Sequence, residues 1–152
     1  MEKSVRPPTR RRLARELAVQ FLYQFDVSGG SLDEALPLFW QTQPEVGDSG
    51  RKFTEELVQG VIEKRDPIDE KIAKYTENWD LPRIAAVDRN ILRLAIYEML
   101  YRDDIPPVVS INEAVDIAKK FSTRESGAFV NGILDRLKAD LTRPSRTASS
   151  AQ

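Results

Sequence analysis

The stretch PPTRRRLARELAVQFLYQF, residues 7–25, predicts the first helix of the chain and sets the class of the fold. At about 100° per residue, apolar side chains three or four positions apart fall on one face of a helix. The apolar side chains that share such a face are Leu13, Ala14, Leu17, Ala18, Phe21 and Phe25. Arg12, Arg15 and Tyr23 fall on the opposite face by the same geometry, so we expect all three to be exposed.

The expected exposed face of this first helix has two interpretations. Arginine side chains neutralise phosphates and an unstacked base can lie on a tyrosine ring, so the face fits a surface that binds single-stranded RNA. The same residues also fit a solvated, arginine-rich helix end with a half-buried tyrosine. Spacing alone leaves both interpretations open, and Arg6 and Arg10 also fit a flexible basic lead-in.

The rest of the chain continues in amphipathic segments, and none alternates with the period of two that is typical of strands. The first helix is expected to end near Asp26, before a Ser-Gly-Gly sequence. Further helices are predicted over about 31–40, 53–65, 66–77, 87–101, 110–121 and 122–141, with a surface loop over 42–50 and one turn of helix within 78–85. The predicted fold class is therefore all-α, with about seven helices arranged in bundles.

Four of these helix starts carry sequence signals. The segments Ser31–Glu34, Ser110–Glu113 and Ser122–Glu125 each match the capping box, in which a serine oxygen and a glutamate carboxylate accept hydrogen bonds from free backbone N–H groups. At the fourth start, Asp66 is expected to be the N-cap and Pro67 the first helical residue, where the missing N–H of proline costs nothing.

The residue types that are absent exclude several kinds of catalysis. The chain contains no cysteine and no histidine, which excludes disulfides, thiolate nucleophiles and serine–histidine catalysis. Sequence patterns typical of calcium, nucleotide and dinucleotide sites are also absent. Adjacent carboxylates such as Glu55 and Glu56 do not face each other on a helix, which makes them poor acid–base pairs. We therefore expect no catalytic residue, no metal and no cofactor in a protein that is not an enzyme.

The charge of the chain is unevenly distributed. Residues 1–16 contain six Lys and Arg residues against two Glu and carry a charge of +4, whereas the remaining 136 residues carry −5. A basic end on an acidic body suggests a localised site for a polyanion. The apolar runs are far shorter than the roughly 20 residues that span a bilayer, and no apolar segment follows the basic start, so we expect a cytoplasmic protein without a membrane partner.

Phe129 and Gly132 are two further candidates, both in the last predicted helix. Phe129 lies at the edge of an apolar stripe that includes Val130 and Ile133, which fits either the core or a platform for a ligand. Gly132 lies in mid-helix, where glycine costs about 1 kcal/mol relative to alanine. Either close helix packing or close approach of another chain or of RNA would explain this glycine.

Three longer segments carry a family resemblance. They are RRRLARELAVQFLYQ (residues 10–24), VDRNILRLAIYEM (residues 87–99) and PPVVSINEAVDIAKKFSTRESGAFVNGILDRL (residues 106–137). Together they resemble the NusB transcription antitermination factors, in the order and at the spacing of that family, over residues 9–138. The three segments together are specific, whereas the arginine run alone is not.

The resemblance implies two packed three-helix bundles in a NusB-like domain over residues 9–141. Residues 1–8 are expected to be a flexible basic lead-in, and residues 142–152, which lack core-forming side chains, a disordered tail. The resemblance further implies binding to boxA-type single-stranded RNA of ribosomal RNA transcripts together with NusE, a ribosomal protein. This pair is expected to act in an antitermination complex with elongating RNA polymerase.

Carried over position by position, the resemblance implies an RNA site formed by Arg11, Arg12, Arg15, Tyr23, Glu125 and Phe129. It places Asp88 in the segment associated with the protein partner. The chain departs from some relatives at Pro107, where they carry an aromatic residue, so stacking from that loop is lost. Gly127 and Ala128 replace larger polar or basic residues, a change that we expect to weaken RNA contacts.

Two other functions fit the sequence. One is a non-catalytic RNA- or protein-docking module of an rRNA methyltransferase system, since rRNA cytosine methyltransferases can carry a NusB-like N-terminal domain. The other is a structural interaction module whose arginines bind an acidic protein. The sequence also fits either a monomer or a dimer.

Overall fold

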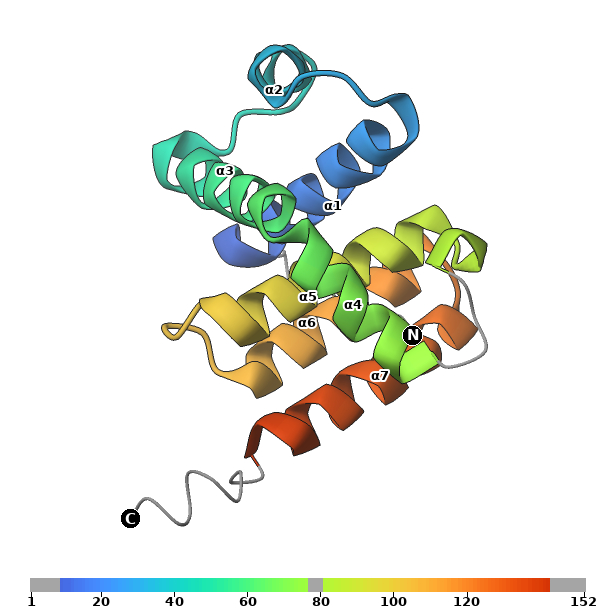
Figure 1. Cartoon of the computed structure of the whole chain (residues 1–152). Coiled ribbons are helices and arrows are strands. Elements are labelled where there is room, and N and C mark those ends of the chain that lie inside the picture. Colours follow the sequence, from blue (N-terminus) through green and yellow to red (C-terminus); the bar gives the residue numbers. More distant parts are fainter. Residues whose placement is uncertain (1–8, 77–80, 143–152) are drawn as a thin grey trace, which may run out of the picture.

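Seven α-helices form the computed structural model of the chain, which describes residues 9–76 and 81–142 (Figure 1). The helices are α1 (Arg10–Ser28), α2 (Leu32–Gln41), α3 (Gly47–Glu63), α4 (Arg65–Thr76), α5 (Ala86–Tyr101), α6 (Pro107–Phe121) and α7 (Arg124–Thr142). A 3₁₀ turn, η1 (Leu81–Arg83), confirms the helical turn predicted within 78–85. Because these described ranges contain no strand, the all-α prediction is confirmed.

The helices are arranged in two bundles that pack against each other (Figure 1). α1, α2 and α3 form the first bundle, and α5, α6 and α7 form the second, with α4 lying across α5 and α7. α5 contacts α1 and α3 of the first bundle as well as α4, α6 and α7. The predicted pair of packed three-helix bundles is confirmed, and α5 is the helix that joins them.

The central position of α5 explains why this helix is buried on nearly all sides. Its apolar side chains Ile91, Leu92 and Ile96 are at most 1% exposed, and each contributes about 1.5–3 kcal/mol when it leaves water. The charged side chains that α5 also buries are Asp88, Arg93 and Glu98. Buried charges are stable only with ionic or hydrogen-bonded partners, so the partners of these residues position the helices around α5.

One end of the interface between α1 and α5 is closed by a network around Asp26. Arg89 donates to Asp26 from Nε and Nη2 over 3.0 and 2.7 Å, and the Asn90 amide donates over 3.1 Å. Arg93 lies 3.1 Å from Asp26 and also donates to both carboxylate oxygens of Asp69 on α4. Burial alone would raise the pKa of Asp26, but these donors hold it below its ordinary value. The network joins α1, α4 and α5.

The face of α1 that was predicted to be buried lies against the core. The fully buried members are Ala14, Leu17, Ala18 and Phe21. Leu13 and Phe25, at the two ends of the stripe, are half-buried. The buried face is wider than predicted and also includes Val19 and Leu22, because α3 and α5 pack on different sides of α1.

The boundaries of several predicted elements differ from the structure, among them those of α1, α3 and α4. α1 continues to Ser28, two residues beyond the predicted end. α3 begins at Gly47, so the second half of the loop predicted over 42–50 is helical. α4 begins at Arg65, which places Asp66 within the first turn and not at the N-cap. There a carboxylate still interacts favourably with the helix dipole, which explains why the same residue resembled a cap.

The start predicted for α6 is wrong because a proline sets it earlier. α6 begins at Pro107, whose fixed φ angle suits the first helical turn. Ser110 therefore lies inside the helix, where its hydroxyl donates to Glu98 over 2.8 Å instead of capping. Ser110 therefore forms a contact between α6 and α5 and is not the cap that the sequence Ser110–Glu113 predicted.

Threonines cap α1 and α7, and two of the serines predicted as caps, Ser31 and Ser122, do not cap a helix through their side chains. Ser31 occupies the N-cap of α2, but its side chain makes no capping hydrogen bond. Thr9 Oγ1 accepts from the N–H of Arg12 over 3.0 Å at the start of α1. At α7, Thr123 Oγ1 accepts from the N–H of Ser126 over 3.0 Å, so the cap lies one residue beyond Ser122.

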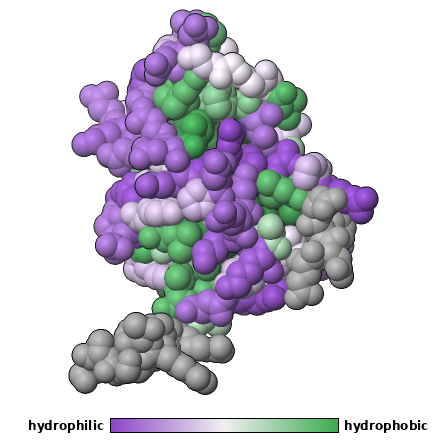
Figure 2. Space-filling view, in the orientation of Figure 1, coloured by the Kyte–Doolittle hydropathy of each residue, from purple (hydrophilic) through white to green (hydrophobic). Residues whose placement is uncertain are grey.

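The predicted lead-in over 1–8 lies outside the described residues, as does the predicted tail over 142–152 apart from Thr142, the last residue of α7. In the view of Figure 2, hydrophilic residues cover much of the visible face, with apolar groups in separate patches. None of the helices within the described ranges is long and apolar enough to cross a membrane.

The packing of α7 predicts a clear difference between two of its leucines. Leu134 is 0% exposed, whereas Leu141 is 44% exposed. We expect Leu134→Ala to lower the free energy of unfolding by about 2–5 kcal/mol, because it removes buried surface and leaves a cavity. Leu141→Ala, the matched control, is expected to change it by about 0.5 kcal/mol or less. Urea denaturation followed by circular dichroism measures both, and equal losses would contradict this core.

Candidate functional site

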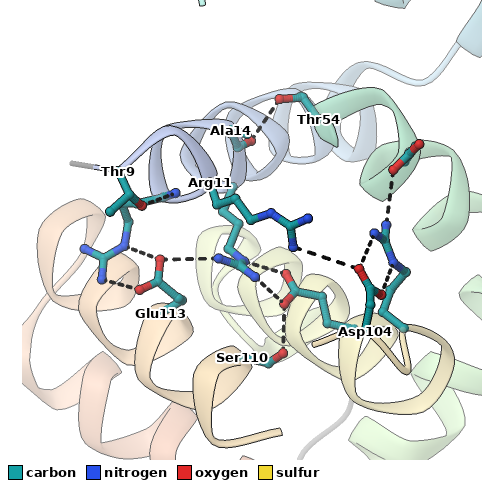
Figure 3. A network of polar contacts seen from close by, with 12 residues as sticks. Thr9, Arg11, Ala14, Thr54, Asp104, Ser110 and Glu113 are labelled. Atoms are coloured by element: carbon teal, nitrogen blue, oxygen red, sulfur yellow. Dashed lines mark hydrogen bonds and ion pairs between the residues drawn. The ribbon is translucent and has the colours of Figure 1, made fainter. Parts of the chain in front are cut away.

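Arg15, one of the three α1 residues expected to be exposed, lies inside the protein. Its side chain is 4% exposed, and its Nε and Nη2 donate to the two carboxylate oxygens of Glu98 over 2.8 and 3.0 Å. Ser110 of α6 donates to the same carboxylate (Figure 3). The expectation of an exposed Arg15 is therefore wrong. Apolar periodicity could not identify this contact, because α5 covers Arg15 with an acidic side chain.

Arg12 is partly exposed, but two carboxylates of α6 hold its guanidinium. Nε and Nη2 donate to Glu113 over 2.6 and 2.8 Å, and Nη2 also donates to Asp116 over 2.8 Å. Figure 3 shows Glu113 reaching from α6 toward α1. The hydrogen bonds that Arg12 donates to Glu113, together with the one that it donates to Asp116, raise the pKa of Arg12 above its ordinary value. Only 22% of the Arg12 side chain is exposed.

Arg12 and Arg15 thus face three carboxylates, those of Glu98, Glu113 and Asp116, and we call these five residues the arginine cluster. Glu113 also lies 3.5 Å from Arg15, which makes the cluster continuous. Attraction between opposite charges at these distances is strong where water is excluded. The cluster joins α1, α5 and α6, and it adds no net positive charge to the surface.

Arg10 and Arg11 keep the exposed positive charge of α1. The Arg11 side chain is 53% exposed, with Nη1 4.0 Å from Asp104 (Figure 3) and the guanidinium 4.2 Å from the centre of the Phe53 ring. An ion pair this long and exposed contributes little to stability. Arg10 is exposed and has no ion pair with any residue that the structure describes. Both arginines can therefore bind an anion without breaking a buried contact.

Tyr23 is exposed as predicted, with 40% of its surface accessible. Tyr23 lies on the same face of α1 as Arg12 and Glu16, because residues four and seven positions apart share a helix face. On this face Glu16 accepts from Lys120 of α6 over 2.9 Å. Tyr23 lies two turns beyond Glu16, past the part of α1 that pairs with α6, and its ring is open to a ligand.

Three cations that were not predicted as site residues lie where α6 ends and α7 begins. They are Lys119, Lys120 and Arg124, and all three are exposed. The stem of Lys119 lies over Gly127, where an added Cβ would be 2.8 Å from Lys119 Cγ. A larger residue at 127 would displace this lysine. The sequence KKFSTR, residues 119–124, is the signal that could have identified these cations.

Asp88, Glu125 and Phe129 line one surface depression of about 220 Å³. The other residues of its wall are Arg83, Ile84, Ala85 and Ser126. The structure thus brings together the residue assigned to a protein partner and two of those assigned to RNA. Phe129 is half-buried against the core, as one interpretation predicts, and it also lines the depression. Its role as a platform for a ligand stays a prediction.

Asp88 has an unused hydrogen-bond acceptor. The residue is 7% exposed, and its Oδ2 accepts from Ser126 Oγ over 3.0 Å. Its Oδ1 is buried without a hydrogen-bond partner among the residues described. Burial raises the pKa of Asp88, because the charged carboxylate loses water that the protein replaces only in part. A donor supplied by a bound molecule would satisfy this oxygen.

Gly132 faces open space. No described atom outside its own helix backbone and chain neighbours lies within 4 Å of a Cβ built at this position. Close helix packing, one of the two interpretations of this glycine, is therefore wrong. Close approach of another chain or of RNA stays a prediction.

Comparison with known sequences assigns the chain to a family. A model of the NusB family matches residues 12–139. The chain is 52% identical over 129 residues to the transcription antitermination protein NusB of Desulforapulum autotrophicum, with 84% of this chain and 90% of that protein covered. It is 47% identical over 137 residues to the protein of the same name from Myxococcus xanthus, with 88% and 98% covered.

Solved structures share the fold. T. maritima NusB superposes with a TM-score of 0.75 at 37% identity, over 88% of this chain and 92% of that one. A chain in the crystal structure of the antitermination factors NusB and NusE in complex with double-stranded RNA superposes with a TM-score of 0.79 at 26% identity, over 86% and 97% of the two chains.

The buried pair of Arg15 and Glu98 predicts that removing one partner costs more than removing both. Glu98→Leu leaves a buried guanidinium without its main partner, and we expect a loss of about 3–5 kcal/mol in the free energy of unfolding. Arg15→Met combined with Glu98→Leu leaves no unpaired charge at this position and should lose less. Urea denaturation compares the variants. A double variant less stable than Glu98→Leu would contradict this prediction, because the destabilising effects of the two substitutions would then simply add.

The raised pKa of Asp88 predicts a pH-dependent effect of Asp88→Asn. For an acid whose pKa is higher in the folded chain, the contribution to stability is present below the unfolded pKa and is lost as the pH rises through the folded pKa. The asparagine variant does not lose stability in this way, because asparagine does not titrate. We expect the unfolding temperature of the variant to rise relative to that of the original chain as the pH increases above about 4, the ordinary pKa of an aspartate. Thermal unfolding across that range tests this, and a constant difference would contradict it.

Proposed function

This chain belongs to the NusB family of transcription antitermination proteins, and on that premise we propose that it is a cytoplasmic factor that binds boxA-type RNA of ribosomal RNA transcripts together with NusE and acts on elongating RNA polymerase. The similar chain found in a complex with NusE and RNA supports both partners.

The observation that carries the RNA proposal is a set of exposed cations on α1 and at the connection between α6 and α7, together with an exposed aromatic ring on α1. Arg10 and Arg11 lie at the start of α1, and Lys119 and Arg124 lie beside the end of α6. Tyr23 lies on the same face of α1 as Glu16, which accepts a hydrogen bond from α6. This face of α1 is directed toward Lys119 and Arg124. Phosphates bind the cations while unstacked bases lie on the ring, which is the arrangement that single-stranded RNA requires.

We name the RNA surface by its contact residues: Arg10, Arg11, Arg12, Tyr23, Lys119, Arg124 and Phe129. Phe129 adds a second ring at the depression, and Glu125 borders it. Arg15 belongs to this function only as a positioning residue. Its ion pair with Glu98 fixes α1, and its buried guanidinium is out of reach of a phosphate. Arg12 contributes a phosphate contact once its carboxylates release it.

NusE is assigned to the side of the depression formed by Asp88. The chain outside residues 1–16 is acidic, which suits a basic protein. The buried Asp88 Oδ1 lacks a donor within the described residues, and a partner side chain or amide would supply one. Since Phe129 lines the same depression, RNA and protein partner would meet there and bind cooperatively.

Fluorescence anisotropy with labelled boxA-type RNA tests the proposed function. The chain is titrated alone, with NusE, and with a scrambled RNA of the same composition, at two fixed salt concentrations. We expect NusE to tighten binding to the boxA-type RNA more than to the scrambled RNA. Equal binding to both RNAs in the presence of NusE would reject boxA recognition.

Tyr23→Ala is expected to weaken binding to this RNA by about 1–3 kcal/mol, the contribution of one stacked base. Tyr101→Ala is the matched control. Tyr101 is similarly exposed, at 39%, but it lies under Lys64 at the C-terminal end of α5. We expect the control to bind as the original chain does. Anisotropy at fixed salt measures both, and an unchanged affinity of Tyr23→Ala would remove Tyr23 from the RNA surface.

A further inference from the structure

Two carboxylates occupy an arginine of the proposed RNA surface. Glu113 holds Arg12 through two hydrogen bonds, and Asp116 holds it through a third. The Lys and Arg residues around this surface that lack such partners, Arg10 and Lys119, show that the fold does not require every cation to be paired. Pairing at Arg12 therefore needs an explanation of its own.

Carboxylates and phosphates compete for the same guanidinium donors. Both bind arginine through two parallel N–H groups. In Arg12 the Nε and Nη2 edge is taken by Glu113, and Asp116 takes the second N–H of Nη2. The Nη1 group makes no hydrogen bond with the described residues. A phosphate that binds the Nε and Nη2 edge must displace Glu113.

Asp116 is the part of this contact that serves folding least. Its side chain is 53% exposed, and its interactions within the described chain are with Arg12. An ion pair at such exposure contributes little to stability. Glu113 is less exposed, at 20%, and also lies near Arg15, so its removal would disturb the buried part of the arginine cluster. Asp116 can therefore be changed without unfolding the chain.

We propose that Glu113 and Asp116 are autoinhibitory residues of the RNA surface, which occupy the hydrogen-bond donors of Arg12 and lower the affinity of this surface for polyanions. This proposal rests on the proposed function. A base-free polyanion and RNA lose the same free energy when they displace the carboxylates. RNA offsets this loss by stacking on Tyr23 and Phe129, whereas a polyanion without bases has no such compensation.

The test compares two charge-neutralising variants of the full chain, Asp116→Asn and Asp33→Asn. Asp33 is the matched control, because it is exposed in the first turn of α2 and forms no ion pair with the residues described. The probes are heparin, a polyanion without bases, and a boxA-type RNA of about 12 nucleotides. Affinities are measured by anisotropy competition at several salt concentrations.

We expect Asp116→Asn to bind heparin and the RNA each about threefold more tightly, with the slope of log affinity against log salt increased by about one. Asp33→Asn should leave both affinities unchanged. Unchanged binding of both probes to Asp116→Asn, or the same gains in Asp33→Asn, would overturn the proposal.

A second readout does not depend on RNA. Solvent exchange of the Arg12 Nε–H, followed by NMR, should be faster in Asp116→Asn than in Asp33→Asn, because the acceptor at Nη2 has lost its negative charge and holds the guanidinium less firmly. If the original chain binds no RNA, the proposed function fails. The heparin and exchange measurements would still show whether Asp116 neutralises Arg12.

Discussion

The buried pair of Arg15 and Glu98 holds α1 against α5, and the orientation of every other side chain of α1 depends on it. A guanidinium with two hydrogen bonds to one carboxylate accepts few rotations of either helix. Ser110 of α6 binds the same carboxylate, so three helices meet at one charge. Because an unpaired charge at 4% exposure is strongly unfavourable, alternative packings of these helices are excluded.

The charges of this cluster also decide which cations remain for a ligand. Arg12 and Arg15 are the most buried arginines of α1, and carboxylates from α5 and α6 neutralise both. Positive charge is left at Arg10 and Arg11 and at the connection between α6 and α7. A surface with cations at its two ends and a centre without net positive charge favours ligands that extend along α1 over compact anions.

The sequence predicted the apolar elements of the fold well and its polar contacts poorly. The periodicity of α1 and α5 identified both helices, because burial of apolar side chains leaves a spacing signal. Arg15 was misplaced, since an arginine that pairs with a distant carboxylate has the same local pattern as an exposed one. Ser110 looked like a cap for the same reason: its partner, Glu98, is far from it in the sequence.

In the candidate site, too, some features could be predicted from the sequence and others could not. Tyr23 was correctly predicted to be exposed, because its position on α1 follows from helix geometry alone. Gly132 could be interpreted only with the structure, since nothing in its neighbours distinguishes a packed glycine from an open one. The depression that unites Asp88 with Phe129 depends on the packing of α5 and α7, which no local pattern records.

The ion pairs at both ends of the interface between α1 and α5 have a consequence for any ligand that follows α1. Arg15 with Glu98 fixes one end, and Asp26 with Arg89 fixes the other. The helix between them is about 16 Å long and cannot slide or bend without breaking one of these contacts. The protein therefore offers a template of constant length, and a flexible ligand that follows this template bears almost all of the entropy lost on binding.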